Sequence, residues 1–173
     1  ILEVRFRTGE PYLNFIDTAN KYLPEPLKEK GLKIHGSNLC NEIHLPTDAD
    51  RTAVCCLSSL NLEYYDEWKN TTIIEDLITM LDNVLEYFVE NAPDSISRAR
   101  YSAERERSIG LGAMGFHSLL QRQGVAWESE LAREINEVVF RTIKERATIQ
   151  TKKLAEERGD YLDGEGSGRS EEH

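Results

Sequence analysis

Ser37–Thr47 reads SNLCNEIHLPT and is the most informative stretch of the chain. It places an amide (Asn38), a thiol (Cys40) and a carboxylate (Glu42) at every second position. If the stretch is extended, alternate side chains point the same way and the three groups reach one site. A thiol beside a hydrogen-bonding amide and a carboxylate base is suited to catalysis. The spacing alone leaves a strand edge with one buried cysteine as an alternative, because free cysteine often serves as a small buried hydrophobe.

A second cysteine-bearing segment follows after a short polar turn. Ala53–Leu62 reads AVCCLSSLNL, a strand-like run that carries Cys55 and Cys56. Adjacent side chains of a strand face opposite sides, so only one of the two thiols can face a given site. Burial in the core is the alternative for both.

The pairing of these two segments resembles the large, catalytic subunit of class I ribonucleotide reductase. Arg107–Gly124, RSIGLGAMGFHSLLQRQG, is similar to a strand-to-helix segment of that family, and Leu154–Arg169, LAEERGDYLDGEGSGR, is similar to the loop after its next helix. The resemblance runs through nearly the whole chain in family order. It implies an α/β fold, namely part of a ten-stranded α/β barrel with a central finger loop, helix-rich in this segment.

The resemblance also implies a role for each residue of the first motif. The residue matching Cys40 lies at the finger-loop tip and becomes a transient thiyl radical that abstracts the 3′ hydrogen of a ribonucleotide. Glu42 matches the carboxylate that accepts the 3′-hydroxyl proton, which is general-base work. Asn38 matches the amide that hydrogen-bonds the sugar hydroxyls. Ser37, Asn38 and Glu42 are therefore expected to bind substrate.

The family strand assigns different roles to the two adjacent cysteines. Cys55 matches one half of the redox-active disulfide pair that reduces the 2′ position, and Cys56 is expected to pack on the outer, helix-covered side. The implied partners are a ribonucleoside diphosphate substrate, a metal-containing small subunit that supplies the radical, and the remaining segments of the large subunit. An external dithiol reductant such as thioredoxin or glutaredoxin is also implied. No cofactor is expected on this chain itself.

Length and charge limit the function further. The 173 residues suffice for one domain with a core, but a reductase large subunit is far longer, so we expect an internal piece that is inactive in isolation. We expect a partial barrel domain over residues 1–163 and a flexible tail or cloning remnant over 164–173. A net charge of -10 disfavours nucleic-acid binding. No apolar stretch is long enough to span a membrane, and three cysteines do not suit a secreted disulfide framework, so a cytoplasmic location is expected.

Other interpretations of the motifs are weaker. Gly110–Gly115 spells GxGxxG, typical of dinucleotide-binding folds, but no sufficient βαβ unit precedes it. Cys40, His44, Cys55 and Cys56 lack the paired spacing of a zinc site, so no metal is expected. The competing function is a non-catalytic interaction or assembly module that retains the reductase scaffold.

Periodicity predicts the main elements. Strands are expected over Tyr12–Ile16 and Ile109–Met114, and helices over Thr72–Glu90, Phe116–Gln123 and Glu128–Arg158. The apolar positions at helical spacing in the first of these helices are Ile73, Leu77, Met80 or Leu81, Val84 and Phe88. Those in the last are Leu131, Ile135, Val138, Thr142 and Leu154.

Overall fold

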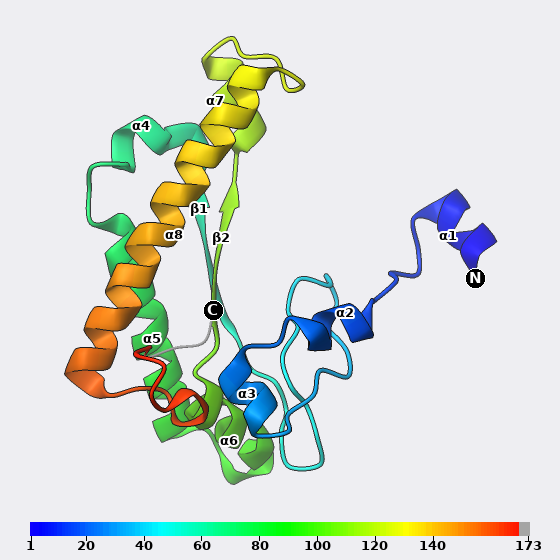
Figure 1. Cartoon of the computed structure of the whole chain (residues 1–173), viewed down its shortest axis with the longest axis vertical. Coiled ribbons are helices and arrows are strands. Elements are labelled where there is room, and N and C mark those ends of the chain that lie inside the picture. Colours follow the sequence, from blue (N-terminus) through cyan, green and yellow to red (C-terminus); the bar gives the residue numbers. More distant parts are fainter. Residues whose placement is uncertain (170–173) are drawn as a thin grey trace.

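The structure is a computed structural model, and it describes residues 1–169 of the chain (Figure 1). Helices account for most of its elements, and two strands lie among them. In chain order the elements are α1 (Leu2–Thr8), α2 (Ile16–Lys21), α3 (Glu25–Glu29), β1 (Cys56–Asn61), η1 (Leu62–Tyr64), α4 (Tyr65–Trp68), α5 (Ile73–Asn91), η2 (Asp94–Ile96), α6 (Ser97–Glu106), β2 (Ile109–Met114), α7 (Phe116–Arg122), α8 (Glu130–Arg158) and η3 (Leu162–Gly164).

The two strands form a parallel pair at the centre of the molecule. Their register runs from Cys56 beside Ile109 to Asn61 beside Met114. Parallel neighbours need a crossover connection, and here α4, α5 and α6 supply it. The bounds of β2 are those predicted from the sequence, and the expected α/β character is confirmed.

One face of the sheet carries the main hydrophobic core. Leu60 of β1 and Ile109 of β2 are buried there beneath α5, and α8 packs against α5 (Figure 1). The fully or nearly fully buried members from the helices are Ile74, Ile78, Leu81, Leu85, Ala103, Leu119, Val139, Ile143, Ala147 and Leu154. The helices therefore cover one side of β1 and β2, and a functional site is to be sought on the other side.

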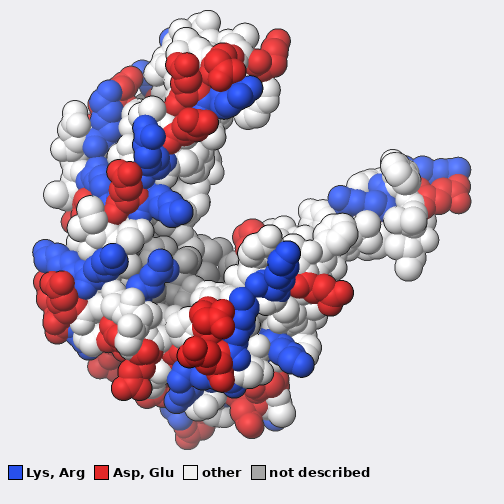
Figure 2. Space-filling model, viewed as in Figure 1, with Lys and Arg blue, Asp and Glu red and all other residues white. Residues whose placement is uncertain are grey.

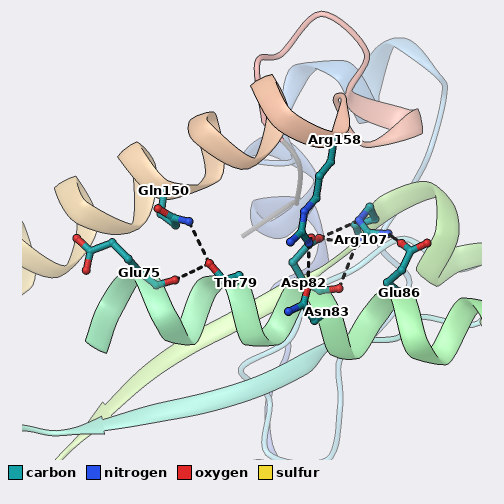
Figure 3. Close-up of polar contacts among 8 residues, drawn as sticks. All are labelled: Glu75, Thr79, Asp82, Asn83, Glu86, Arg107, Gln150 and Arg158. Atoms are coloured by element: carbon teal, nitrogen blue, oxygen red, sulfur yellow. Dashed lines mark hydrogen bonds and ion pairs between the residues drawn. The ribbon is translucent and has the colours of Figure 1, made fainter. Parts of the chain in front are cut away.

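A buried carboxylate ties this helix layer to the start of β2. Asp82 of α5 is fully buried and accepts hydrogen bonds from Nε and Nη2 of Arg107, at 3.1 and 2.5 Å, and from Arg158 of α8 (Figure 3). Glu86 forms an ion pair with the Nη1 atom of Arg107 at 2.6 Å. Arg107 has a positive φ of 46° and directly precedes the β-bridge that leads into β2. Asp82 thus fixes the turn from which β2 departs.

A second layer lies on the other side of the strands, where α2 and α3 are drawn (Figure 1). Its small core consists of Leu23, Leu27, Ile34 and Tyr161. Asn20 holds this layer together, because its side chain donates to the carbonyl of Ile34 at 2.8 Å and accepts from the amide of Ile34 at 2.9 Å. The segment that contains residues 37–47 is attached here.

The prediction of a strand over Tyr12–Ile16 is wrong. Residues 12–15 have no regular structure, and Ile16 begins α2. Tertiary contacts decide this difference: Ile16 packs against the second core, and Asn20, one turn later, bonds to Ile34. An aromatic, apolar run of five residues does not distinguish a strand from a helix start by itself.

A buried ion-pair cluster joins the second layer to α6 and η3. The Nη1 atom of Arg51 lies 2.7 Å from Oε1 of Glu106 and 2.7 Å from Oδ2 of Asp163. Arg105 donates to Oδ1 of Asp163 at 2.9 Å through Nε. Both carboxylates are almost fully buried, so the segment just before β1 is held to the C-terminal part of the domain.

Residues 165–169 fold back onto the residues that precede η3. The amide of Tyr161 donates to the carbonyl of Arg169 at 3.0 Å, and the amide of Gly166 donates to Asp160 at 2.7 Å. Residues 170–173 of the predicted tail lie outside the described residues. The domain boundary after residue 163 stays a prediction.

The surface carries both signs of charge. Figure 2 shows Lys and Arg mixed with Asp and Glu over the visible face, which is hollowed beside the arm that ends in α1. Over residues 1–169, no helix combines the length and apolar character needed to cross a bilayer.

Candidate active site

Residues 37–47, called the finger loop below, form a turn. The amide of Asn41 donates to the carbonyl of Asn38 at 3.1 Å, and the amide of Asn38 donates to the carbonyl of Ile43 at 3.3 Å. The Oδ1 atom of Asn38 accepts from the amides of Glu42 and Ile43, at 3.1 and 2.9 Å. Asn41 has a φ of 67°, a left-handed conformation that Asn adopts more readily than most residues. One amide side chain therefore organises the whole turn.

The extended conformation assumed for this stretch is wrong. Between Asn38 and Ile43 the chain reverses, so Asn38, Cys40 and Glu42 are not alternate residues of a strand. The cause is local, because the Asn38 side chain takes the place of a strand partner for two backbone amides. The three side chains are positioned by the turn.

The structure places the predicted site residues at different positions on the turn. Cys40 is exposed near the tip of the turn, next to Leu39, whose exposed fraction is 92%. Glu42 is also exposed, but it lies on the returning arm and lines a cavity together with Cys55. Ser37 and Asn38 line a neighbouring cavity, which also contains Cys55 in its wall.

These two cavities lie between the finger loop and the residues in and around the parallel strands. The first, called the Glu42 cavity, has a volume of about 430 Å³, and its wall includes Glu42, Cys55, Ser108 and Gly110. The second, called the Asn38 cavity, has a volume of about 590 Å³. Cys55 is common to both, so the structure brings Cys55 together with Glu42 on one side and with Asn38 on the other.

The two adjacent thiols have different surroundings. Cys56 is partly buried and packs against the main core, whereas Cys55 faces the cavities. Burial, together with smaller contributions from the nearby Cys56 and Glu42, raises the pKa of the Cys55 thiol to about 11. Burial also raises the pKa of Cys56. Cys55 is therefore held as a neutral S–H group at neutral pH.

Gly110 of β2 leaves space beside Cys55. A Cβ atom at this position would lie 2.5 Å from Cδ2 of Leu57 and 3.7 Å from Sγ of Cys55. The second glycine of the GxGxxG run, Gly112, would likewise place a Cβ 3.1 Å from Oγ of Ser59. These glycines permit close strand packing on the cavity face.

The predicted catalytic and substrate-binding residues leave out two polar residues that line the site. Ser108 lines the Glu42 cavity, and the only sequence signal for it is its place one residue before the β2 strand. His44 lines the same cavity, and its Nε2 atom lies 2.8 Å from Oδ1 of Asn14. Among residues 1–169, His, Cys, Asp and Glu side chains form no group of three or more that could hold a metal ion.

Comparison with known proteins gives this geometry a family. A family model described as "Ribonucleotide reductase, barrel domain" matches residues 1–172. The chain belongs to the ribonucleotide reductase barrel-domain family. The predicted fold class, a helix-rich part of this barrel domain, is thereby confirmed.

Individual relatives agree with the family assignment. A protein of Frog virus 3 (isolate Goorha), provisionally named as a ribonucleoside-diphosphate reductase large subunit, is 58% identical over 176 residues, which is 100% of this chain and 31% of that protein. The ribonucleoside-diphosphate reductase large subunit of Invertebrate iridescent virus 3 is 49% identical over 174 residues, again 100% of this chain and 28% of the relative.

A solved structure matches as well. The Actinobacillus ureae class Id ribonucleotide reductase alpha subunit superimposes with a TM-score of 0.92 at 41% identity, over 98% of this chain and 33% of that subunit. The chain thus spans about a third of the length of these three reductase relatives. The parallel pair, its helices and the finger loop are one portion of the family's barrel domain.

Proposed function

We propose that this chain is the segment of a class I ribonucleoside-diphosphate reductase large subunit that carries Asn38, Cys40, Glu42 and Cys55 as site residues. The reaction converts ribonucleotides to deoxyribonucleotides through a thiyl radical. The observation that carries the proposal is the finger loop lying over the strand face, with Glu42 and Cys55 in the wall of one cavity. A general base and a reducing thiol thereby share one space.

In this proposal each site residue of the finger loop has a distinct role. Cys40, exposed near the turn tip, forms the thiyl radical that abstracts the 3′ hydrogen, and Glu42 accepts the 3′-hydroxyl proton. Asn38 already uses Oδ1 to bond two backbone amides, which leaves its Nδ2 group to donate to a sugar hydroxyl. Ser37 binds substrate from the same side, in the wall of the Asn38 cavity.

The environment of Cys55 supports its role as half of the redox-active pair. With a pKa raised to about 11, mainly by burial, the sulfur remains protonated at neutral pH. A protonated thiol is the form that supplies hydrogen for reduction of the 2′ position. Cys56, against the core, is a packing residue in this scheme.

The proposal includes partners outside the chain. The radical comes from a metal-containing small subunit, the disulfide is reduced by an external dithiol such as thioredoxin or glutaredoxin, and the remaining segments of the large subunit complete the site. The substrate is a ribonucleoside diphosphate. The reaction takes place in the cytoplasm.

A chimaeric large subunit tests this function. This chain replaces the matching third of the Actinobacillus ureae alpha subunit, and the chimaera is assayed for deoxynucleotide with a class I small subunit and a dithiol. Turnover is expected. Cys40→Ser abolishes it, because an alcohol O–H bond is too strong to relay the radical, whereas Cys55→Ser permits hydrogen abstraction but diverts substrate to decay products.

Cys56→Ser is the matched control, because it changes the adjacent thiol on the core side and is expected to retain turnover. Equal, mild losses in the Cys40 and Cys55 variants would contradict the proposed division of roles. A folded chimaera without any turnover would favour the competing function, an assembly module that retains the reductase scaffold.

A further inference from the structure

Ser108 is the cross-strand neighbour of Cys55. The parallel register pairs Cys56 with Ile109, and the amide of Cys56 donates to the carbonyl of Ser108 at 3.2 Å. One residue earlier on each segment, the register therefore sets Cys55 beside Ser108. Side chains alternate along a strand, so Ser108 faces the same side as Gly110, whose missing Cβ would lie 3.7 Å from the Cys55 sulfur.

Within residues 1–169, the Ser108 hydroxyl is buried without a hydrogen-bond donor or acceptor. The residue is 1% exposed, and its Oγ atom has no hydrogen-bond partner among the residues that the structure describes. Ser108 and Cys55 both line the Glu42 cavity. Buried polar groups in folded proteins are nearly always hydrogen-bonded, so an unpartnered hydroxyl that faces a cavity indicates a partner that forms in another state of the site.

The Cys55 sulfur lies within reach of that hydroxyl. Adjacent strands are about 4.8 Å apart, and a hydroxyl and a thiol that extend from neighbouring positions approach hydrogen-bond distance after a change of side-chain rotamer. In the present arrangement the Cys55 thiol donates a hydrogen bond to the carbonyl of Cys56, with 3.8 Å between sulfur and oxygen. A thiol needs no donor in this state, but a thiolate does.

We propose that Ser108 is a positioning residue for Cys55, and that its hydroxyl donates a hydrogen bond to the Cys55 sulfur when that sulfur carries negative charge. This inference rests on the proposed redox role of Cys55 and deepens it. When an external dithiol reduces the disulfide, its thiolate forms a new S–S bond to one sulfur of the pair. The old S–S bond breaks, and its electrons leave on the other sulfur, which then takes a proton from solvent.

The surroundings of Cys55 make such a donor necessary when Cys55 is the leaving sulfur. Cys56 on β1 and Glu42 on the finger loop both disfavour negative charge there, in addition to burial. The other titratable groups that line the two cavities are His44 and His35. The β2 strand, IGLGAM, brings no titratable side chain, so the Ser108 hydroxyl is the donor from the β2 side.

The matched variants Ser108→Thr and Ser108→Val test the proposal, because their side chains have nearly the same shape and differ in one hydroxyl. Both are made in the full 173-residue chain with Cys40→Ser and Cys56→Ala, so that Cys55 is the sole cysteine. The protein is labelled with [3-13C]cysteine, and the Cβ chemical shift is followed against pH to give the thiolate population. Circular dichroism and thermal melting check that each variant is folded.

The expected result is a Cys55 pKa about one unit higher in Ser108→Val than in Ser108→Thr, with Thr close to the parent, since a hydrogen bond to a charged group commonly shifts a pKa by about this amount. At a pH below both midpoints the thiolate population then differs about tenfold. Ser102→Ala is the control, because Ser102 on α6 also carries a buried, unpartnered hydroxyl in the described chain, and it should leave the titration unchanged.

Coinciding titrations for the Thr and Val variants would overturn the proposal. If Ser108→Val fails to fold, Ser108→Ala against Ser108→Thr gives the same comparison. The measurement needs no turnover, so its outcome is independent of whether the chimaera reduces ribonucleotides.

Discussion

The buried carboxylate of Asp82 is expected to be a sensitive polar position in the chain. Asp82→Asn keeps the shape of the side chain but removes the charge that faces Arg107 and Arg158 (Figure 3). Burial lowers the pKa of Arg107, but hydrogen bonds and attraction from Asp82 and Glu86 outweigh it and raise that pKa overall. In the variant, the Arg107 guanidinium keeps only Glu86 as a counter-charge.

The size of the effect follows from burial. Breaking a buried ion pair by removing one partner costs about 3–5 kcal/mol. Glu86 remains bound to Arg107 at 2.6 Å, and the Arg158 side chain is 39% exposed and can be hydrated, so the lower end, about 3 kcal/mol, applies. For a domain of this size each kcal/mol lowers the melting temperature by about 2–4 °C, which gives a drop of about 6–12 °C.

Urea unfolding followed by circular dichroism measures this loss, because α5 and α8 dominate the helical signal. Glu86→Gln is the matched control: its ion pair with the same arginine is half exposed, so its removal should cost less than about 1 kcal/mol. A loss below 1 kcal/mol for Asp82→Asn, or equal losses for the two variants, would show that Asp82 does not hold α5, α8 and the start of β2 together.

Three further outcomes are expected. Glu42→Gln in the chimaera should lower the turnover rate in steady-state kinetics by about 10²–10⁴-fold with little change in KM. The melting temperature of the chain should stay nearly unchanged. A large stability loss with a normal rate would instead assign Glu42 a structural role. The hydrogen bond from Arg146 lowers the pKa of Glu75, so this pair stabilises the fold above the ordinary Glu pKa of 4.5, and the contribution is lost as pH falls. The difference in unfolding free energy between the parent and Glu75→Gln should therefore shrink from pH 7 to pH 3 in urea titrations. Gly115→Ala should destabilise the chain by about 1–3 kcal/mol in the same assay, because φ is +78° and the new Cβ would lie 3.1 Å from the amide nitrogen of Glu63; an unchanged midpoint would refute this.

The sequence predicts β2 and the long helices well. Ile109–Met114 is a short apolar run with turn and helix signals on either side, and its predicted bounds coincide with the strand. The finger loop shows where this reasoning fails. Its turn depends on the Asn38 side chain, which bonds the amides of two residues further along, and periodicity carries no information about such bonds.

Periodicity also fails to say which apolar face of a helix is buried here. In α5 the predicted positions Ile73 and Val84 are exposed, whereas Ile74 and Ile78 are fully buried. Of the two alternatives Met80 and Leu81, Leu81 is the buried one. The helix carries apolar residues on two faces, so its spacing fits both. Only the packing partner, here the strand pair together with α8, decides between them.

In α8 the same ambiguity recurs. Leu131 and Val138, both predicted on the apolar face, are about half exposed, while Val139 and Ile143 are buried. Leu154 is buried as its position in the pattern suggests. At the site, resemblance identifies Cys55 and Glu42, but the neighbour of Cys55 across the strand pair requires the register, and no pattern within one segment supplies a register.

The order of the finger loop and its strands along the chain has a consequence during synthesis. Cys40 leaves the ribosome before β1 and well before β2, the strands over which its loop lies. About 70 residues separate Cys40 from the end of β2, and translation at about 5–20 residues per second takes roughly 4–14 s over that distance. Throughout this interval the thiol has no strand face behind it. Because Cys40 stays exposed near the turn tip after folding, a reducing environment protects this thiol both in the nascent chain and in the folded domain.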